Sequence, residues 1–382
     1  MDSFDHPYYK LNKRLLLLVG QWPYQESSER RFRIFIIFLF FTCNGDIEII
    51  IESMAPVSAV MVGIIKYYTL QFNRDKVSFF FSFFFYMKFS LIISLYYFNI
   101  NFFFSTVSYA KVSIYLYIYT CMTMFLILPF FPRIMDSVVP LNESRPLKPI
   151  FKGEYFIDED EHFFPIYFHM SICIVISITA LITGDTLFLM FNSHICGIFA
   201  AVGYRLENFL KDQIDSKSSL DNLSEHKCLE NILYSIRNHK SALKFAELIE
   251  SFYSLSLLLQ AGLSLICMSI SLFEVIMLVV LQNSAESFRY FNFAVAQLVH
   301  LFCMCYPGQR MIDYSTDIRI KAYSGLWYEA PLPIHKLLIL IIRKSLKPSY
   351  LTAGKIFIFC LETFATILQT ATSYFMVISS VQ

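Results

Sequence analysis

Long uninterrupted apolar runs are the feature that most limits what this chain can fold into. The runs 165–191 and 248–281 are each longer than the roughly 18 residues that a helix needs to cross the hydrocarbon core of a membrane. Within lipid, every backbone N–H and C=O group must be hydrogen-bonded inside the protein, which leaves helices and closed barrels as spanning structures. The short strands of alternating polarity that a barrel requires are not evident in the sequence. The runs therefore predict an all-α membrane protein.

The composition agrees with this class. Hydrophobic residues make up 56% of the 382 residues and charged residues only 16%, whereas soluble domains carry about 25% charge. The formal net charge of +1 gives no indication of a nucleic-acid partner. The GxSxG, HExxH and P-loop patterns of common enzymes do not occur, and the pair His226 and Cys228 is too small to hold a metal. We therefore expect no enzyme activity, no cofactor and no metal site.

The apolar runs divide the chain into seven expected transmembrane helices. A short amphipathic segment, 8–24, precedes them, and its basic residues followed by Trp22 and Tyr24 are typical of a helix at the membrane interface. The expected spans are about 34–51, 57–72, 114–132, 165–191, 248–281, 290–306 and 356–378.

The distribution of basic residues predicts the orientation of these spans. Residues 1–33 contain six Lys and Arg, and 310–355 contains eight against three acidic residues. Because an excess of Lys and Arg marks the cytoplasmic side, we expect a cytoplasmic N-terminus and an extracellular C-terminus. The segment 211–247 is then cytoplasmic and the loop 133–164 extracellular, which suits the glycosylation sequon that begins at Asn142.

The segment 77–105 does not fit this count. Its 29 residues carry a single charge, Lys88, and are enough for one span, but one more span would invert every later loop, and two would need about 40 residues. Residues 76–78 (Lys-Val-Ser) are what a consensus splice donor would encode, and 102–105 (Phe-Phe-Phe-Ser) what a pyrimidine tract would encode. We therefore expect 77–105 to be a translated intron within an atypical region, 77–108. If it belongs to the protein, it is expected to lie as a helix on the cytoplasmic membrane surface.

Four stretches resemble the insect odorant receptor family, in the style of its expansion in ants, bees and wasps. They are 8–25, 138–165, 185–209 and 322–380, including YYKLNKRLLLLVGQWPYQ and the final SYFMV. The resemblance implies a seven-helix subunit that assembles with a shared odorant co-receptor as a heterotetramer and forms a ligand-gated, non-selective cation channel. It also implies a volatile small-molecule ligand, and a location in the plasma membrane of olfactory sensory neuron dendrites.

The last apolar run carries polar residues at intervals of three and four. This spacing places them on one face of a helix, and a polar stripe within a span faces water or protein rather than lipid. Pore lining and hydrogen bonding between helices both satisfy that requirement, and the resemblance favours the pore. It also implies a hydrophobic gate at Val377 and a polar ring at Ser380 or Gln382. The expected pore and gate residues are Glu362, Thr366, Gln369, Thr370, Ser373, Val377 and Ser380.

The resemblance places the odorant pocket in the outer half of the bundle formed by the second to sixth spans. Such a site is expected to be mostly apolar with few polar groups, and Met suits adaptable recognition. Core packing is the alternative explanation for each candidate, and His169 is either a donor to a carbonyl odorant or a structural histidine. The candidates are Val60, Met61, Ile64, Cys121, Met124, Phe125, His169, Met170, Cys173, Phe291, Ala294 and Leu298.

The expected organisation has four parts. Residues 1–33 form a cytoplasmic N-terminus with the interfacial helix, and 34–309 form the membrane bundle with the pocket. Residues 310–355 form a cytoplasmic anchor, and 356–382 the pore-lining helix with a short outer tail. A gustatory-type receptor channel and a G-protein-coupled receptor are alternatives, although Asp-Arg-Tyr is missing after the third span and Asn-Pro-x-x-Tyr from the last. A transporter would require an internal repeat, which is not evident.

Overall fold

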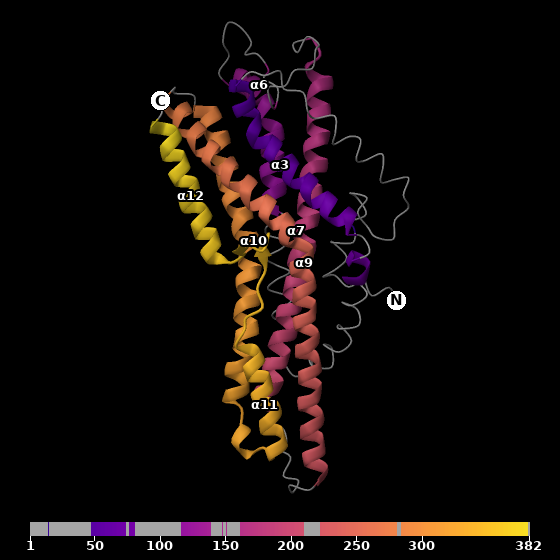
Figure 1. Cartoon of the computed structure of the whole chain (residues 1–382). Helices are drawn as coiled ribbons and strands as arrows, with labels where there is room; N and C mark the ends of the chain where they lie inside the picture. Colours follow the sequence, from indigo (N-terminus) through magenta and orange to yellow (C-terminus); the bar gives the residue numbers. More distant parts are fainter. Residues whose placement is uncertain are drawn as a thin grey trace.

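The computed structural model describes residues 14, 47–73, 76–80, 116–138, 147, 150, 161–209, 222–280 and 284–380. This part of the chain is almost entirely helical (Figure 1). Its elements are α3 (Ile47–Phe72), η2 (Leu128–Phe130), α6 (Phe131–Val138), α7 (Phe163–Asn208), α9 (Asn222–Val280), α10 (Ser284–Ser324), η3 (Trp327–Glu329), α11 (Leu332–Ser345), β1 (Thr352–Ala353), β2 (Phe357–Ile358) and α12 (Leu361–Ser380).

Three long rods, α7, α9 and α10, form the frame of an elongated bundle. Figure 1 shows α3, α6 and α12 gathered at one end together with the C-terminus, and α11 at the opposite end. The rods contain 46, 59 and 41 residues. At 1.5 Å per residue, α9 is about 88 Å long, compared with about 30 Å for the hydrocarbon core of a bilayer. The rods therefore continue well beyond the membrane.

Apolar helices of spanning length confirm the helical membrane class. In the described part of the chain, Phe163–Asn208, Cys228–Val280 and Ser287–Ser324 are long and apolar enough to cross a membrane, and Leu116–Ile127 is a shorter apolar helix. The total of seven spans and the orientation of the termini stay predictions. The interfacial segment 8–24 apart from Arg14, the sequon at Asn142 and most of 77–108 lie outside the described residues.

Several expected element boundaries are wrong. Residues 52–56, expected to be a gap between the first two spans, are helical within α3. This stretch contains Pro56, and a proline is tolerated in a membrane helix where neighbouring groups satisfy the backbone that it leaves unbonded. Residues 222–247 continue α9, which therefore begins before the expected span 248–281, and their expected cytoplasmic location stays a prediction. The last helix starts at Leu361 rather than 356, because 357–358 pair with 352–353 as a two-residue strand.

The core is built around α7, which lies between α3, α9 and α10. Phe188, Phe191 and Phe199 on α7 are fully buried, and Phe191 meets Phe245 of α9 edge-on with ring centroids 6.1 Å apart. Edge-to-face aromatic pairs of this kind add stabilisation beyond the apolar area they bury. Aromatic packing therefore holds α7 and α9 together at this level of the bundle.

The first residues of the atypical segment also belong to this core. Residues 76–80 are helical, and the side chains of Val77 and Phe80 are buried. The Phe80 ring lies 5.0 Å from that of Phe191 and 5.4 Å from that of Phe252, centroid to centroid. The translated-intron hypothesis for 77–105 stays a prediction, and sequencing cDNA across codons 70–112 tests it.

We expect Phe80→Ala to destabilise the full chain by about 3–5 kcal/mol, because it would empty an aromatic site in the core. Phe79→Ala is the matched control, since the Phe79 side chain is 49% exposed. Size-exclusion chromatography after heating to a series of temperatures would give the melting temperature of each variant. Equal melting temperatures for the two would show that 76–80 does not pack as described.

A hairpin between α9 and α10 determines where α12 begins. Strands β1 and β2 pair in antiparallel register, with Thr352 opposite Ile358. The turn contains Gly354 and Lys355, both at φ +61°, and the Gly354 N–H donates to the Ser254 carbonyl of α9 at 2.8 Å. On the other side, a Cβ added to Gly308 of α10 would lie 1.9 Å from the Phe359 carbonyl oxygen. The hairpin is therefore held between the two rods.

Candidate ligand site in the helix bundle

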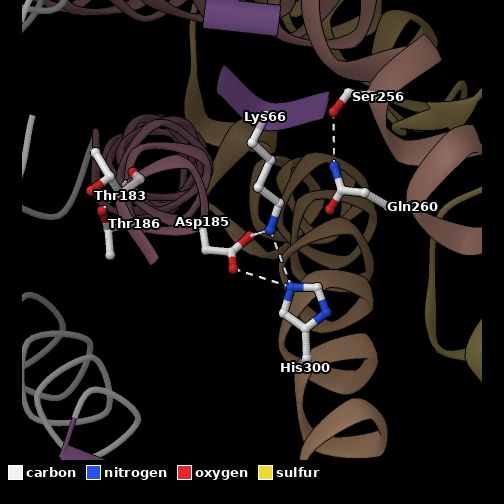
Figure 2. Close-up of polar contacts among 7 residues, drawn as sticks. All are labelled: Lys66, Thr183, Asp185, Thr186, Ser256, Gln260 and His300. Carbon is white, nitrogen blue, oxygen red and sulfur yellow. Dashed lines mark hydrogen bonds and ion pairs between the residues drawn. The ribbon is translucent and has the colours of Figure 1, made fainter. Parts of the chain in front are cut away.

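Three ionisable side chains from three helices meet inside the bundle. Lys66 of α3 donates to Asp185 Oδ1 of α7, and His300 Nε2 of α10 lies 3.1 Å from Asp185 Oδ2 (Figure 2). The Lys66 and Asp185 side chains are 5% and 13% exposed, and that of His300 is 16% exposed. We call these three residues the ionic cluster. Buried charges of this kind are costly unless paired, and within membrane helices they mark functional sites.

Small residues bring α3 and α7 close enough for the cluster to form. A Cβ added to Gly184 would lie 3.0 Å from the Cβ and Cδ of Lys66, so the aliphatic part of Lys66 lies against the α7 backbone. Nearer the start of both helices, a Cβ added to Gly63 of α3 would lie 3.2 Å from the carbonyl oxygen of Ser177 on α7. Small residues allow such close approach between membrane helices. Lys66 is thereby positioned directly beside Asp185, the neighbour of Gly184.

The ionic cluster cannot satisfy all of its own hydrogen-bonding groups. His300 Nε2 also lies 3.1 Å from Lys66 Nζ, but a nitrogen of neutral imidazole either donates or accepts. If Nε2 donates to Asp185, one of the three N–H groups of Lys66 bonds to Asp185 and two are left. If Nε2 instead accepts from Lys66, one N–H group is left. In either tautomer, at least one buried N–H of Lys66 has no acceptor among the described residues.

Helix α9 adds two incompletely bonded polar groups nearby. The Tyr253 hydroxyl is buried without a hydrogen-bond partner in the described part of the chain, and the Tyr253 ring lies 5.0 Å from that of Phe188 on α7, centroid to centroid. The Gln260 amide donates to Ser256 Oγ at 2.8 Å, but its carbonyl oxygen Oε1 is buried without a described partner. Figure 2 shows the Gln260 side chain reaching from its helix toward the side on which Lys66 and His300 lie. Leaving such groups unbonded costs about 1–3 kcal/mol each.

Other polar groups beside the cluster are satisfied locally. The Thr183 hydroxyl donates to the Thr179 carbonyl at 2.6 Å, and the Thr186 hydroxyl to the Thr183 carbonyl at 2.9 Å. These threonines bond to their own helix and leave no buried donor. Beside the cluster, Lys66, Tyr253 and Gln260 keep unmet hydrogen-bonding capacity, and within the described residues buried atoms without a partner also occur farther along the bundle, at Asn192 Oδ1 and His239 Nε2.

Most of the predicted pocket residues lie on the same helices as the cluster, whereas Cys121, Met124 and Phe125 lie on the shorter helix Leu116–Ile127. On α3, Val60 and Ile64 precede Lys66 by less than two turns, and on α10 Ala294 and Leu298 precede His300 likewise. Since α3, α7 and α10 run in the same direction, from the end where α6 lies (Figure 1), the cluster lies farther from that end than these residues do.

Burial divides the predicted pocket residues into three groups. Met170 is buried in a small apolar cluster against which Phe125 packs, and His169 Nε2 lies 3.8 Å from Cys173 Sγ. Whether any of these residues contacts a ligand stays a prediction. The buried group is Val60, Met170, Cys173 and Ala294; the half-buried group is Ile64, Cys121, Phe125 and His169; and the exposed group is Met61, Met124, Phe291 and Leu298.

The ionic cluster was not among the expected site residues, although the sequence carries a signal for it. Lys66, Asp185 and His300 each interrupt an expected span with an ionisable side chain. A residue of that kind within a membrane helix is a functional-site candidate in its own right. What the sequence does not show is that the three side chains meet.

The predicted pore residues of α12 lie on a face that its own subunit leaves uncovered. The opposite face carries the buried Ala371 and the partly buried Phe364, Ile367 and Leu368, which pack against the core. In the described part of the chain, none of the predicted pore residues bonds to another helix, and the Thr370 hydroxyl donates to the Thr366 carbonyl at 2.7 Å. Exposed are Glu362, Thr366, Gln369, Ser373, Val377 and Ser380, with Thr370 half-buried.

Comparisons with known proteins agree on one family. Residues 46–372 match the family model described as 7tm Odorant receptor. Odorant receptor 67c of Drosophila melanogaster is 26% identical over 171 residues, which are 44% of this chain and 39% of that protein. The odorant receptor coreceptor of Aedes aegypti is 24% identical over 147 residues, 38% of this chain and 30% of that protein. The chain therefore matches well under half the length of these curated relatives.

A solved structure has the same fold. The insect olfactory receptor OR5 from Machilis hrabei, in complex with eugenol, superposes with a TM-score of 0.75. The superposition covers 98% of this chain and 97% of that one at 14% sequence identity. A likeness at this level of identity concerns the arrangement of the helices and not the residues of a site.

Proposed function

Because the chain belongs to the insect odorant receptor family, we propose that it is an odorant receptor subunit that binds a volatile, mostly apolar ligand and opens a non-selective cation channel. Family membership already makes it a receptor of the membrane and not an enzyme. The ligand would bind among α3, α7, α9 and α10, on the outer side of the ionic cluster, and α12 would line the pore.

The exposed polar stripe of α12 is the observation that carries this proposal. A helix that packs one face against its own subunit and leaves Thr366, Gln369 and Ser373 uncovered cannot face lipid with that stripe at low cost. Water in a central pore, surrounded by equivalent helices of other subunits, would satisfy those polar groups. The ring of Val377 side chains would close such a pore by dewetting.

The other subunits in this proposal are copies of an odorant co-receptor. Co-receptors of several insects are among the relatives that this chain resembles, which supports an assembly of related subunits around one axis. The basic segment 310–355, with α11 and the hairpin, would form the cytoplasmic contacts, and the complex would reside in the plasma membrane of olfactory neuron dendrites.

Co-expression with an insect odorant co-receptor in oocytes under voltage clamp tests the proposal. We expect inward currents in response to members of a broad panel of volatiles, and no such responses from the co-receptor alone. Surface labelling of the subunit is the necessary control. Silence to the whole panel in cells with labelled subunit at the surface would reject the proposed function.

A cysteine scan of α12 tests the pore assignment. We expect Thr366→Cys to react with a charged methanethiosulfonate reagent during channel opening and to change the current irreversibly, because its side chain would face water. Ala371→Cys is the matched control, since Ala371 is buried against the core. Equal modification of the two positions, or modification of Ala371→Cys alone, would place the pore on another face.

A further inference from the structure

We propose that the ionic cluster keeps the channel closed at rest, because it fixes α10 against α3 and α7, and α10 in turn fixes the position of the pore helix α12. His300 is the member of the cluster that α10 contributes, and it acts as a positioning residue. This inference rests on the proposed function, in which α12 lines a ligand-gated pore, and it adds the part of the bundle that sets the resting position of α12.

Helix α10 contacts the cluster and α12 within less than one helical turn. His300 Nε2 lies 3.1 Å from Asp185 Oδ2. Two residues farther on, the ring of Phe302 meets the ring of Phe364 on α12 edge-on, with centroids 5.7 Å apart. Positions two residues apart in a helix differ by about 200° around its axis and about 3 Å along it. The two side chains therefore leave α10 on nearly opposite sides, so that a turn or tilt of α10 moves both contacts together.

The cluster is better suited to specifying one arrangement of the helices than to stabilising the fold. Buried ion pairs contribute little net stability, because the cost of desolvating the charges offsets their attraction. At least one N–H of Lys66 also lacks an acceptor among the described residues, and an incompletely bonded network is costly. Hydrogen bonds are directional, however, and weaken steeply when they bend, whereas apolar contacts are non-directional. The cluster therefore favours one placement of α10 over neighbouring placements.

Helix α12 is tied to α10 at its beginning. It starts directly after Phe359, whose carbonyl oxygen would lie 1.9 Å from a Cβ added to Gly308 of α10. Phe364, which meets α10 edge-on, belongs to the first turn of α12. Farther along, Ser269 of α9 donates to the carbonyl of Ala371 at 3.3 Å, which is long for such a bond. A shift of α10 is therefore passed to the first turn of the pore helix.

The direction of the effect follows from the resting state of a ligand-gated channel. Without ligand such a channel is closed nearly all of the time, so its open fraction can hardly fall. Removing a bond that favours one placement of α10 allows other placements, and with them other positions of α12, to become populated. The open fraction at rest is therefore expected to rise.

The resting current of two His300 variants tests the inference. His300→Phe keeps a ring and removes the bonds to the cluster, while Lys66 and Asp185 stay paired and leave no unpaired charge. His300→Gln provides an amide N–H that can replace Nε2–H as the donor to Asp185. In oocytes with the co-receptor and without odorant, the measured quantity is the current lost when Na⁺ is replaced by the large cation N-methyl-D-glucamine. Per labelled surface subunit, we expect it to rise about 10-fold in His300→Phe and to stay at the parental level in His300→Gln.

Two further variants provide the control and test the route. Asn292→Leu removes a polar group of α10 whose amide donates to the carbonyl of Phe288 in the same helix at 2.9 Å, and it should leave the resting current unchanged. Phe302→Ala removes the ring contact with Phe364 and should raise the resting current as His300→Phe does. Because both changes act through one contact, the double variant should conduct no more at rest than either single variant.

Hydrogen exchange of the purified full chain in lipid nanodiscs tests the same link without any current. Amides at 361–368, in the first turns of α12, should exchange about 10-fold faster in His300→Phe than in the parent, because α12 would no longer be held in one position. His300→Gln should exchange as the parent does. Amides at 222–240 of α9 serve as the internal reference and should be unaffected in both variants.

The outcomes separate this inference from the channel proposal. A parental resting current in His300→Phe, in cells that respond to odorant, would overturn the inference, and so would unchanged exchange at 361–368. A rise that Asn292→Leu shares would overturn it as well, since the effect would then not belong to the cluster. Faster exchange in a protein that carries no current with any odorant would leave the link between the cluster and α12 standing and reject the channel function instead.

Discussion

Replacing Lys66 alone by methionine should cost far more stability than removing Lys66 and Asp185 together. The single variant Lys66→Met leaves the Asp185 carboxylate, 13% exposed, inside the bundle with His300 as its remaining bonded partner among the described residues. Breaking one half of a buried ion pair costs about 3–5 kcal/mol, because an uncompensated charge remains. The paired variant with Asp185→Asn has no such charge, and replacing a buried pair by neutral groups is often close to neutral in stability.

Fluorescence-detected size-exclusion chromatography after heating would measure this difference. We expect the single variant to lose most of its monodisperse peak at temperatures at which the paired variant keeps it. Asp317→Asn, which removes one half of the half-buried pair with Lys321, should have a smaller effect, because Asp317 is 40% exposed and pairs near the surface contribute only about 0–1 kcal/mol. A single variant as stable as the paired one would show that Lys66 and Asp185 do not depend on each other.

Gly308→Ala should strongly reduce ligand-evoked current while leaving the long rods folded. The new Cβ would lie 1.9 Å from the Phe359 carbonyl oxygen, which belongs to the backbone and cannot rotate away. The hairpin must therefore move, and with it the start of α12 at Leu361. Overpacking of this kind costs about 1–3 kcal/mol, which corresponds to a factor of about 5 to 150 in the population of the native arrangement.

Gly262→Ala in α9 is the matched control for this prediction. A Cβ at Gly262 meets nothing within 4 Å, and alanine favours a helix over glycine by about 0.5–1 kcal/mol. Current per labelled subunit at the cell surface should therefore be normal in Gly262→Ala and reduced by about 5- to 150-fold in Gly308→Ala. Similar currents from the two variants would mean that α12 is not positioned through this contact.

The sequence predicts the helical membrane class well, because runs such as 165–191 leave few other possibilities. It does not predict the length of α9, since residues 222–247 are polar and their helical form depends on packing against other rods. The hairpin is also missed, because Phe357 and Ile358 continue the apolar run that leads into α12. A local pattern cannot show that a short strand is held by α9 and α10.

For the candidate site, the sequence shows which residues are unusual but not which of them meet. The stripe on α12 is visible as a helical repeat, and the structure leaves that stripe uncovered as a pore would require. Lys66, Asp185 and His300 are visible only as separate interruptions of three expected spans. Their meeting depends on the close approach of α3 and α7 at Gly63 and Gly184, which is a property of the assembled bundle.

The length of the rods has a consequence for how such receptors can diversify. On α9, Tyr253 lies 31 residues from the helix start at Asn222, which is about 46 Å along the axis. If the receptor works as proposed, substitutions that alter recognition around Tyr253 are thereby far removed from the surfaces at the opposite end near α11. Duplicated genes could accumulate changes in ligand preference while still producing subunits that assemble with an unchanged partner. The same separation would let an engineer exchange the outer portion of one receptor for that of another within continuous helices.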